Sequence, residues 1–444
     1  MRAFSRAAVW GSLVISAAWG VTSAGEEVFE TPVRLTAGGT VIDTGEQWGH
    51  SGPHMADVDG DGVRDLIVGS FDSKFRVFRN TGTESNPEFA AFEYLQAGGK
   101  DAEVWIYCCI GSSPQFVDFD DDGHLDMISG SYDPGEFYLF RGTGGGQYAA
   151  RETLVDTAGV PVRRHPVQKQ NYQSFGSWIS TADWEHDGDL DLILGGFDGS
   201  LYVRINTGTR QEPKFAPENV DILVDGKPAM VPGRHAALDV ADWDADGKWD
   251  IVSGSDEGGV YWFRNIGTPE QPQFAAPETL LPPHVGNGYT DVWEVRAEPR
   301  VGIRTQVDVT DYNGDGKLDL LVGDFGGTIT PRPDLTAEER QKFASLIEER
   351  TASTQVLKDG MEAMRKRFME KYPGDLVFSD EADKAWTKEY QEFRNSDTVK
   401  QAQERSTEIS KEIGTYLEDP KTPSRFSPEE KTTQHGFVWL FLRK

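Results

Sequence analysis

The sequence predicts a mainly β protein: a β-propeller of five four-stranded blades, with an α-helical hairpin or bundle inserted in the last blade. Three observations predict this fold. An aspartate-rich loop occurs five times, a short apolar run that reaches a glycine follows each loop, and a helical segment separates the fifth repeat from a final strand. A period of about 40–60 residues with several short strands in each repeat is typical of propellers.

The aspartate-rich loops have the composition of cation-binding loops. They begin at Asp57, Asp118, Asp183, Asp242 and Asp311, so that successive loops start 59 to 69 residues apart. Positions 1, 3, 5 and 9 carry oxygen-bearing side chains, and position 6 is a glycine that permits a sharp turn. A hard cation such as Ca²⁺ takes about six to eight oxygen ligands, which one short loop can supply only by turning in this way.

We therefore expect up to five structural Ca²⁺ ions. The alternative is that the loops are solvated acidic turns. The predicted metal ligands of the five loops, in order, are Asp57, Asp59, Asp61 and Asp65; Asp118, Asp120, Asp122 and Asp126; Asp183, Glu185, Asp187 and Asp191; Asp242, Asp244, Asp246 and Asp250; and Asp311, Asn313, Asp315 and Asp319.

The residues after each loop exclude an EF-hand, which would place glutamate at position 12 and a helix on each side. Here an apolar run ending in glycine follows, as in residues 66–69, and such runs indicate strands. A further strand such as residues 74–79 comes next, and an aromatic-led strand such as residues 29–35 or 89–95 begins each repeat. Four strands in about 60 residues make one blade, so five blades fill residues 25–330.

At this point the chain resembles a known family. The aspartate loops, together with the segments 69–71 and 195–199, are similar to the FG-GAP/VCBS repeats of secreted bacterial proteins and of integrin-type propellers. The resemblance covers roughly residues 26–330 and the last strand. It implies a propeller fold and calcium binding, but it does not fix an activity, because such propellers serve as lectins, adhesion proteins, lyase accessory domains and scaffolds.

The net charge and the N-terminal segment indicate the class of binding partner and the cellular compartment. The 444 residues include 73 Asp and Glu against 44 Lys and Arg, and the net charge of −29 argues against nucleic-acid binding. Residues 1–24 are typical of a signal peptide, with Arg2 and Arg6 before an apolar run and small residues up to Ala24. The run is short for a membrane span, so we expect a secreted or periplasmic protein without one. Cys108 and Cys109 form either a strained, redox-labile ring or two reduced thiols on opposite faces of a strand.

Residues 331–433 predict the helical insertion. Thr336 with Glu339 forms a capping box, and Ser379 and Ser396 are candidate N-caps of two further segments. Apolar residues from Val399 to Tyr416 alternate at spacings of three and four, as in a coiled coil. The high charge favours an arm that projects for self-association or a protein partner, rather than a lid packed on the propeller. Residues 434–444 then supply the closing strand of the last blade.

A ligand is expected on the face opposite the acidic loops, around the axis. The segments that lead into the inner strands are long and rich in aromatic residues, histidine and arginine, which suit a sugar or an anionic carbohydrate. The alternative is that the aromatic residues wedge between blades. The candidate ligand-binding residues are Trp48, His50, Tyr107, Trp178, Arg234, His235, Trp293, Arg300 and Arg304.

The sequence contains no G-x-S-x-G elbow, phosphate loop or H-E-x-x-H motif, and no catalytic residues are assigned. The first functional hypothesis is an exported calcium-binding propeller that acts as a binding, adhesion or scaffold module for carbohydrate or protein. The alternative is a carbohydrate-active enzyme, a polysaccharide lyase or hydrolase, that uses the axial mouth. A redox role for the cysteine pair is a third hypothesis.

Overall fold

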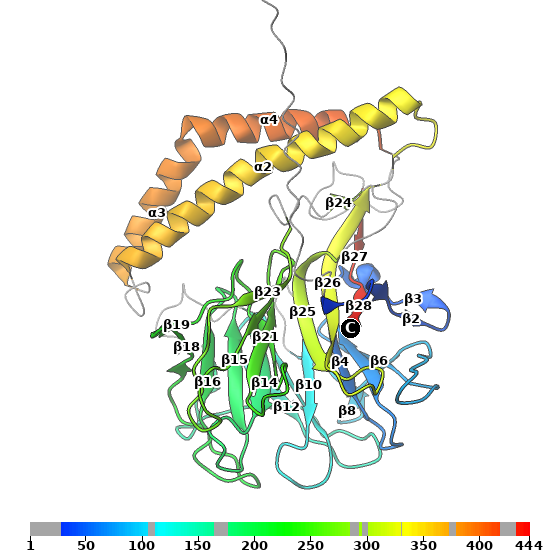
Figure 1. The fold of residues 1–444 in the computed structure, drawn as a ribbon, viewed down its shortest axis with the longest axis vertical. Coiled ribbons are helices and arrows are strands. Elements are labelled where there is room, and N and C mark those ends of the chain that lie inside the picture. The colour runs from blue at the N-terminus through cyan, green and yellow to red at the C-terminus, as the bar shows by residue number, and fades with distance from the viewer. Residues whose placement is uncertain are drawn as a thin grey trace, which may run out of the picture.

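The computed structural model of the protein describes residues 28–104, 112–163, 176–284, 293–294, 301–329, 331–372, 379–417 and 432–444, with only the backbone at 293–294. Within these ranges the fold is mainly β, with many small antiparallel sheets and three α-helices (Figure 1). Tyr107, Arg300, the cysteine pair and the expected signal peptide lie outside the described residues.

Four of the five main sheets contain four antiparallel strands in sequence order. The first sheet comprises β4 (Gly52–Ala56), β5 (Asp65–Gly69), β6 (Phe75–Phe78) and β7 (Glu93–Tyr94). The second comprises β10 (Pro114–Val117), β11 (Asp126–Gly130), β12 (Phe137–Phe140) and β13 (Glu152–Thr153). The third comprises β14 (Ser177–Ala182), β15 (Asp191–Gly196), β16 (Leu201–Arg204) and β17 (Val220–Asp221). The fourth comprises β20 (Ala237–Ala241), β21 (Asp250–Gly254), β22 (Val260–Phe263) and β23 (Glu278–Leu281).

The fifth main sheet joins the two ends of the described chain. It comprises β25 (Ile303–Thr310), β26 (Asp319–Ile329), β28 (Val438–Phe441) and β1 (Val33–Arg34), with β24 (Trp293–Glu294) and β27 (Thr432–His435) paired to the far half of β26. In place of the single predicted closing strand there are two strands, separated by Gly436 and Phe437. Because β1 pairs with β28, the aromatic-led segment that begins each sequence repeat is the outermost strand of the preceding sheet, which corrects the expected grouping.

Smaller elements link the main sheets. They are the hairpins β2 (Thr36–Ala37) with β3 (Thr40–Val41), β8 (Gln96–Ala97) with β9 (Lys100–Asp101) and β18 (Leu223–Val224) with β19 (Lys227–Pro228), and the 3₁₀ turn η1 (Gly45–Gln47).

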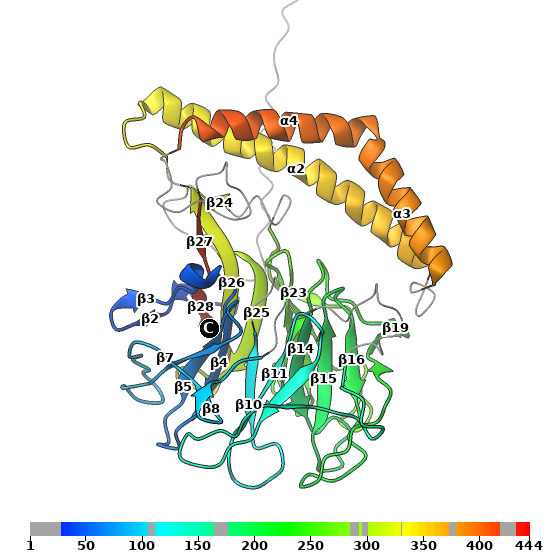
Figure 2. The ribbon, with the colours of Figure 1, turned by 180° about the vertical axis from the view of Figure 1, so that it is seen from behind.

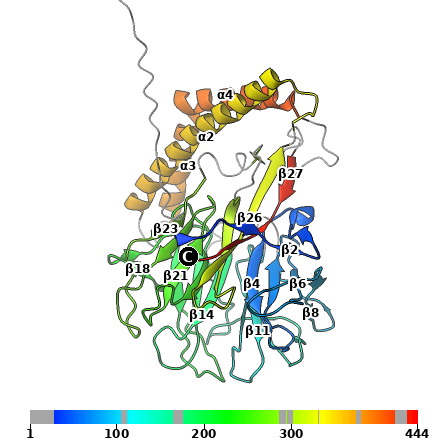
Figure 3. The same ribbon diagram turned by 45° about the vertical axis from the view of Figure 1, so that its right-hand side comes forward.

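The five main sheets are arranged around an axis as in a β-propeller (Figures 2 and 3). The first strands contact one another in the cyclic order β4, β10, β14, β20, β25 and again β4. The fifth residue of each second strand is a glycine, and a Cβ atom there would lie 1.8–2.1 Å from a carbonyl oxygen of the next sheet. Gly69 faces Ser112 in this way, and Gly323 of the fifth sheet faces Ser51 of the first. The glycine that ends each apolar run therefore permits the close approach of neighbouring sheets.

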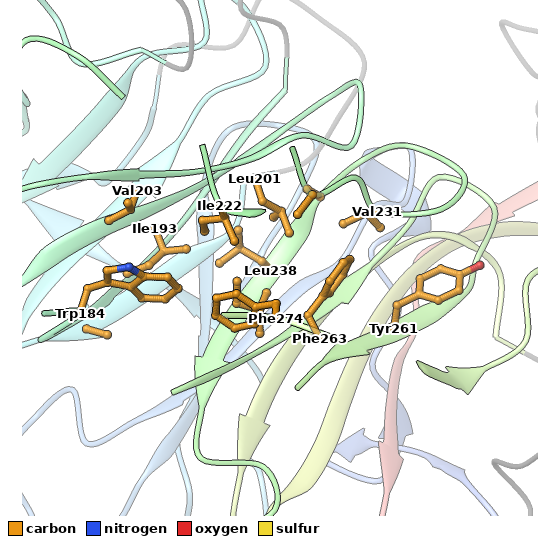
Figure 4. Packing of buried hydrophobic residues seen from close by; sticks show 14 residues of the cluster. Trp184, Ile193, Leu201, Val203, Ile222, Val231, Leu238, Tyr261, Phe263 and Phe274 are labelled. Carbon is orange, nitrogen blue, oxygen red and sulfur yellow. The ribbon is translucent and has the colours of Figure 1, made fainter. Parts of the chain in front are cut away.

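The core consists of apolar layers between adjacent sheets. Figure 4 shows the layer between the third and fourth sheets, where Ile193 and Leu201 meet Leu238 and Phe263. The aromatic residue at position 2 of a loop packs in such a layer, as Trp184 does against Phe274 at a ring distance of 5.7 Å. The wedge role considered for the aromatic candidate ligand residues applies to Trp178, which is 3% exposed and shares an apolar cluster with Ala237 of the fourth sheet.

The helices are α2 (Ala337–Lys371), α3 (Asp380–Asn395) and α4 (Asp397–Gly414), which lie in sequence between β26 and β27. The Thr336 capping box and the N-caps at Ser379 and Ser396 are confirmed, because each side chain accepts a hydrogen bond from the first turn. Among the described helices, none is long and apolar enough to cross a membrane.

The helices do not form a projecting arm. The seam of α4 is buried against α2, and Ile409 and Ile413 share one apolar cluster with Phe343, Leu346 and the sheet residue Phe325. The expectation from charge was wrong because the charged residues lie on the outer faces, while an apolar stripe of α2 packs on the propeller. The lid arrangement is the one observed.

Candidate functional site

The two ends of the sheets carry different chemistry. The acidic loops connect the first and second strands of each main sheet and so lie together at one end. The turns between second and third strands, and the segments that lead into the first strands, lie at the other end, over which α2 crosses (Figure 1).

Each acidic loop folds around its first aspartate. In the first loop, Asp57 Oδ1 accepts hydrogen bonds from Gly60 N at 2.8 Å and Asp61 N at 3.1 Å, and Oδ2 accepts one from Gly62 N at 2.9 Å. Gly62 has a φ of 90°, the conformation for which glycine was predicted there. The equivalent first aspartates of the other four loops accept the same bonds from positions 5 and 6.

Three of the loops gather carboxylate oxygens within 4.8 Å of one another. The groups are Asp57, Asp59 and Asp61; Asp118, Asp120 and Asp126; and Asp242, Asp244 and Asp246. Among the described residues, Oδ1 of Asp120 and Oδ1 of Asp244 are buried and accept no hydrogen bond. Buried carboxylate oxygens without a donor fit the requirements of a hard cation.

The aspartate at position 9 has a second role that the sequence did not reveal. Asp191 is fully buried, and its Oδ1 accepts a hydrogen bond from Asn206 N at 2.7 Å while Oδ2 accepts one from Trp184 N at 3.2 Å. Burial raises the pKa of Asp191 to about 7. The equivalent residues Asp65, Asp126, Asp250 and Asp319 also bond to the backbone just after the third strand of their sheet.

The loops differ in an arginine at the end of the third strand. Arg79 lies 3.1 Å from Asp59 Oδ2, Arg264 lies 2.6 Å from Asp244 Oδ2, and Arg141 pairs with Asp120. The equivalent positions in the third and fifth sheets are Ile205 and Leu442. Three loops therefore carry a guanidinium beside the position-3 carboxylate, and the other two carry an aliphatic residue in its place.

At the opposite end, one residue from each main sheet lies just beyond the fifth-position glycine of the second strand, in the turn after the strand in the first four sheets and within β26 in the fifth. We call it the tip residue, and it lies two positions after the glycine discussed above. The five tip residues are Phe71, Tyr132, Phe197, Asp256 and Phe325. Four are aromatic and the fourth sheet alone has a carboxylate, so the ring of tips has one charged side.

Two buried histidines lie among these aromatic tips. His50 stacks between Phe325 at 4.4 Å and Phe71 at 5.4 Å, and His235 lies 4.3 Å from Phe197 and 5.4 Å from Trp178. Their exposures are 2% and 1%. Burial lowers the pKa of His235 to about 3 and holds that of His50 well below its usual value, so both rings are neutral at neutral pH.

Several imidazole nitrogens have no protein partner. Within the described residues, Nδ1 of His50 and both nitrogens of His235 make no hydrogen bond, although His235 Nδ1 lies 3.4 Å from Asp256 Oδ1. A neutral imidazole has one donor and one acceptor, and leaving them unpaired inside a protein costs about 1–3 kcal/mol for each group. These atoms are available to a polar ligand or to water.

Asp256 holds two arginines at this end. Its Oδ2 lies 2.5 Å from Arg234 Nη2, its Oδ1 lies 3.2 Å from Arg304 Nε, and Arg304 Nη1 lies 3.3 Å from His50 Nε2. Burial opposes ionisation of Asp256, but His235, Arg234 and Arg304 outweigh it and hold the pKa well below its usual value. We call His50, Arg234, His235, Asp256 and Arg304 the axial cluster.

Three residues of the axial cluster occupy a repeated left-handed backbone position at which the third sheet has a glycine. His50, His235 and Arg304 each lie seven residues before a loop aspartate and have φ values of 53–65°; the equivalent residue of the third sheet is Gly176, with φ of 58°. Arg234 also has a positive φ of 67°. A left-handed conformation costs a non-glycine residue of the order of 1 kcal/mol, and residues held in it often belong to functional sites.

A polar layer lies below the cluster along the axis. Trp178 Nε1 donates to Gln306 Oε1 at 3.1 Å, while the buried Gln306 Nε2 has no partner among the described residues. Deeper still, His54 Nδ1 lies 2.5 Å from Asp308 Oδ1, and Ser180 Oγ donates to Asp239 at 3.0 Å. Burial, and then Asp308, raises the pKa of Asp239 to about 6.

The structure thus brings together five of the candidate ligand residues: His50, Trp178, Arg234, His235 and Arg304. Trp48 joins them through Phe71, at a ring distance of 6.2 Å. The structure does not describe the side chain of Trp293 or the residues Tyr107 and Arg300. Asp256 and the aromatic tips were missed, although their common position two residues after the glycine was a signal that aligning the repeats would have found.

Helix α2 contacts the tips of three sheets. Arg365 Nη2 donates to the carbonyl of Asp198 at 2.7 Å, next to the tip of the third sheet. Lys358 Nζ lies 2.8 Å from Glu257 Oε2, next to the tip of the fourth. Phe325, the tip of the fifth, packs in the cluster with Phe343. The helix therefore lies over the axial cluster on the side of the third, fourth and fifth sheets.

Comparison with protein-family models matches residues 242–322 to the FG-GAP-like repeat. The match starts at the first aspartate of the fourth loop and ends in β26, so it contains both the fourth and the fifth acidic loops. A search of curated proteins finds no match.

Several solved structures are similar in fold. One is an Agrocybe aegerita lectin, described as recognising non-reducing terminal N-acetylglucosamine, which is 20% identical to this chain with a TM-score of 0.33. The similarity covers 62% of this chain and 60% of the lectin, so this chain spans less than two thirds of the lectin's length. The catalytic domain of Coprinopsis cinerea GH62 α-L-arabinofuranosidase is 12% identical with a TM-score of 0.43, and the similarity covers 70% of this chain and 93% of that domain. A Schwanniomyces occidentalis fructofuranosidase variant bound to fructosylnystose is 10% identical with a TM-score of 0.32, and the similarity covers 66% of this chain and 56% of the fructofuranosidase. At these identities and scores the likenesses support no inference about ligand or activity.

Proposed function

We propose that the protein is an exported, calcium-stabilised, five-bladed propeller that acts as a binding or adhesion module, and that the axial cluster binds a carbohydrate. The observation that carries the proposal is the pair of buried imidazoles, His50 and His235, whose free nitrogens lie among aromatic rings. The ligand is either a free carbohydrate or a carbohydrate attached to an extracellular partner protein.

The chemistry of the axial cluster suits a sugar. Aromatic faces such as those of Phe71 and Phe197 stack on the apolar C–H faces of sugar rings. A neutral imidazole offers one donor and one acceptor to hydroxyl groups, and arginines bind a sugar carboxylate through paired charge-assisted hydrogen bonds. A largely apolar site with a few convergent polar groups is typical of small-molecule binding sites.

The proposed role of calcium is structural. The residues that would hold it are the oxygen-bearing side chains at positions 1, 3 and 5 of each loop, which are carboxylates except for Asn313, with position 9 nearby. A bound divalent cation would neutralise carboxylates that otherwise repel one another and would fix the loop between two strands. Any ion that binds only the folded chain also stabilises it by mass action.

A glycan-binding screen on the full chain tests the carbohydrate proposal. His235→Phe keeps a ring beside Phe197 and removes both unpaired nitrogens, so we expect at least tenfold weaker binding with a melting temperature no lower than that of the parent. His124→Phe makes the same change at an exposed position of the second acidic loop and serves as the control. Equal binding by the His235→Phe variant and the parent would contradict the proposal.

A carbohydrate-active enzyme is the second candidate function. It is favoured by the buried carboxyl groups of Asp239 and Asp308 below the cluster, because burial, and then Asp308, raises the pKa of Asp239 to about 6, and a carboxyl group with a raised pKa can act as a general acid. The same screen, analysed for released products, distinguishes the two functions. Products that vanish in Asp239→Asn would favour the enzyme, whereas binding without products favours the module.

A further inference from the structure

The mouth end of the propeller receives a third arginine from outside the sheets. Arg365 belongs to α2, 61 residues beyond Arg304 in the sequence, and it reaches the tip of the third sheet through its 2.7 Å hydrogen bond to the carbonyl of Asp198. The residue before Asp198 is Phe197, whose ring lies 5.5 Å from the guanidinium of Arg234. Arg365 and Arg234 therefore approach the same tip from the helix and from the sheets.

Among the described residues, the cationic side chains around this tip differ in whether they form an ion pair. Arg234 and Arg304 share the single carboxylate of Asp256, and Lys358 is balanced by Glu257. Arg365 bonds to a backbone carbonyl, and no carboxylate forms an ion pair with it among the described residues. Burial and then the nearby positive charge of Arg234 lower the pKa of Arg365, with opposing effects from Asp198, Glu362 and Asp256.

The guanidinium groups of Arg234 and Arg365 approach a tip that lies beside unsatisfied polar atoms. His235 follows Arg234 directly in the chain, is 1% exposed and has both ring nitrogens without a hydrogen bond. An acidic sugar would answer both features, since its carboxylate would bind guanidinium groups and its hydroxyls would bind the imidazole. A neutral sugar would satisfy the imidazole and leave the third guanidinium without a carboxylate.

We propose that Arg365 completes an anion-recognition site with Arg234 and Arg304, and that the site binds the carboxylate of an acidic sugar. The inference rests on the proposed carbohydrate function of the axial cluster and specifies its ligand class. It also assigns the helical segment a direct part in ligand recognition: α2 supplies a specificity-determining side chain as well as covering the cluster. Guanidinium and carboxylate form two parallel hydrogen bonds, a geometry that an ammonium group does not reproduce.

The test uses calorimetric titration of the full chain with trisaccharides of glucuronate, galacturonate and mannuronate, each paired with its neutral methyl ester. The ester lacks the negative charge and carries one added methyl group, so the affinity ratio is compared between the parent and the variants, in which this added group is the same. We expect at least one acid to bind tenfold or more tightly than its ester, and the ratio to fall to about threefold or less in Arg365→Gln. Affinity for the ester, whose carbonyl oxygen can still accept a hydrogen bond, should fall less than affinity for the acid in that variant.

Two further variants control the experiment. Arg367→Gln removes an exposed arginine from the same helix and should keep the parental ratio. Arg365→Lys keeps the charge and loses the planar fork, so it should restore only part of the ratio. Equal melting temperatures exclude a general loss of structure, and a titration with inorganic sulfate shows whether a free oxyanion binds without the sugar.

The outcomes separate this inference from the proposed function. Equal binding of acid and ester by the parent, or an unchanged ratio in Arg365→Gln, overturns the inference and leaves carbohydrate binding in place. Binding of neither acid nor ester overturns both proposals. Sulfate binding as tight as that of the acids would overturn the assignment to a sugar.

Discussion

The two ends of the main sheets follow the sequence repeat to different degrees. At the end with the acidic loops, all five repeats place the same kinds of residue at positions 1, 5, 6 and 9. At the end beneath α2, equivalent positions differ: Gly176 in the third sheet corresponds to His50, His235 and Arg304 in others, and the aromatic tips give way to Asp256 in the fourth.

This difference separates what supports the fold from what can recognise a ligand. A feature present in every repeat contributes the same interaction five times, as the glycine contacts between neighbouring sheets do. A departure from the repeat that also forces a non-glycine residue to a positive φ costs stability, and the cost is explained most simply by a function at that place. Four predictions test the comparison.

The largest effect is expected from a change in the repeated glycine. A Cβ on Gly195 would lie 1.8 Å from the carbonyl oxygen of Ala236, so Gly195→Ala must push two sheets apart and should lower the free energy of unfolding by about 3 kcal/mol or more. Gly414→Ala is the control, because no atom lies within 4 Å of its Cβ. Denaturant unfolding measures both, and a loss below about 1 kcal/mol in Gly195→Ala would refute the close-packing account.

The next effect is expected from removal of calcium. Each occupied site should stabilise the fold by about 2.7 kcal/mol when free calcium is about 100 times the dissociation constant, so a chelator should lower the melting temperature strongly. Asp246→Ala should remove about one site from a calorimetric titration, while Glu270→Ala, an exposed carboxylate outside the loops, should leave the number of sites unchanged. Melting temperatures that do not respond to calcium would mean that the loops are solvated turns.

A third effect concerns pH at the mouth end. His235 has a pKa of about 3 in the folded chain against the ordinary 6.5, so between these values the unfolded chain binds a proton that the folded chain does not. The stability from the neutral ring is present above pH 6.5 and is lost as pH falls toward 3, by an amount of the order of 3 kcal/mol. Unfolding curves from pH 7 to pH 4 should show a smaller loss in His235→Phe, and parallel losses would contradict the assignment.

The smallest effect is expected from the contact between α2 and the fourth sheet. Lys358→Met removes the partner of Glu257 at a half-buried position and should cost about 1 kcal/mol. Lys366→Met changes an exposed lysine of the same helix and should cost less than about 0.5 kcal/mol. Two variants of equal stability would indicate that the helix does not depend on this contact.

The sequence predicted those features that depend on residues close together in the chain. The acidic loops, the strands that follow them and the helix caps at Thr336, Ser379 and Ser396 each follow from a short pattern. Their geometry is set by local backbone conformation, so no knowledge of distant segments is required.

Features that depend on distant segments were missed or misjudged. The pairing of β1 with β28 joins the two ends of the described chain, and the hydrogen bond from Arg365 to Asp198 spans 167 residues. The helices pack on the propeller through a few apolar residues such as Phe343. The high average charge of the helices hides this narrow apolar stripe in the sequence. Composition reports the exposed faces of a helix more strongly than a narrow buried stripe.

The most direct test of the central claim is hydrogen–deuterium exchange of the full chain, measured first with calcium and then with an oligouronate added. Calcium should slow exchange in the acidic loops, and the oligouronate should slow it in residues 48–52, 232–236, 254–258 and 361–368 without further change in the loops. Protection by the sugar at the acidic loops, or no protection at the mouth end, would contradict the account.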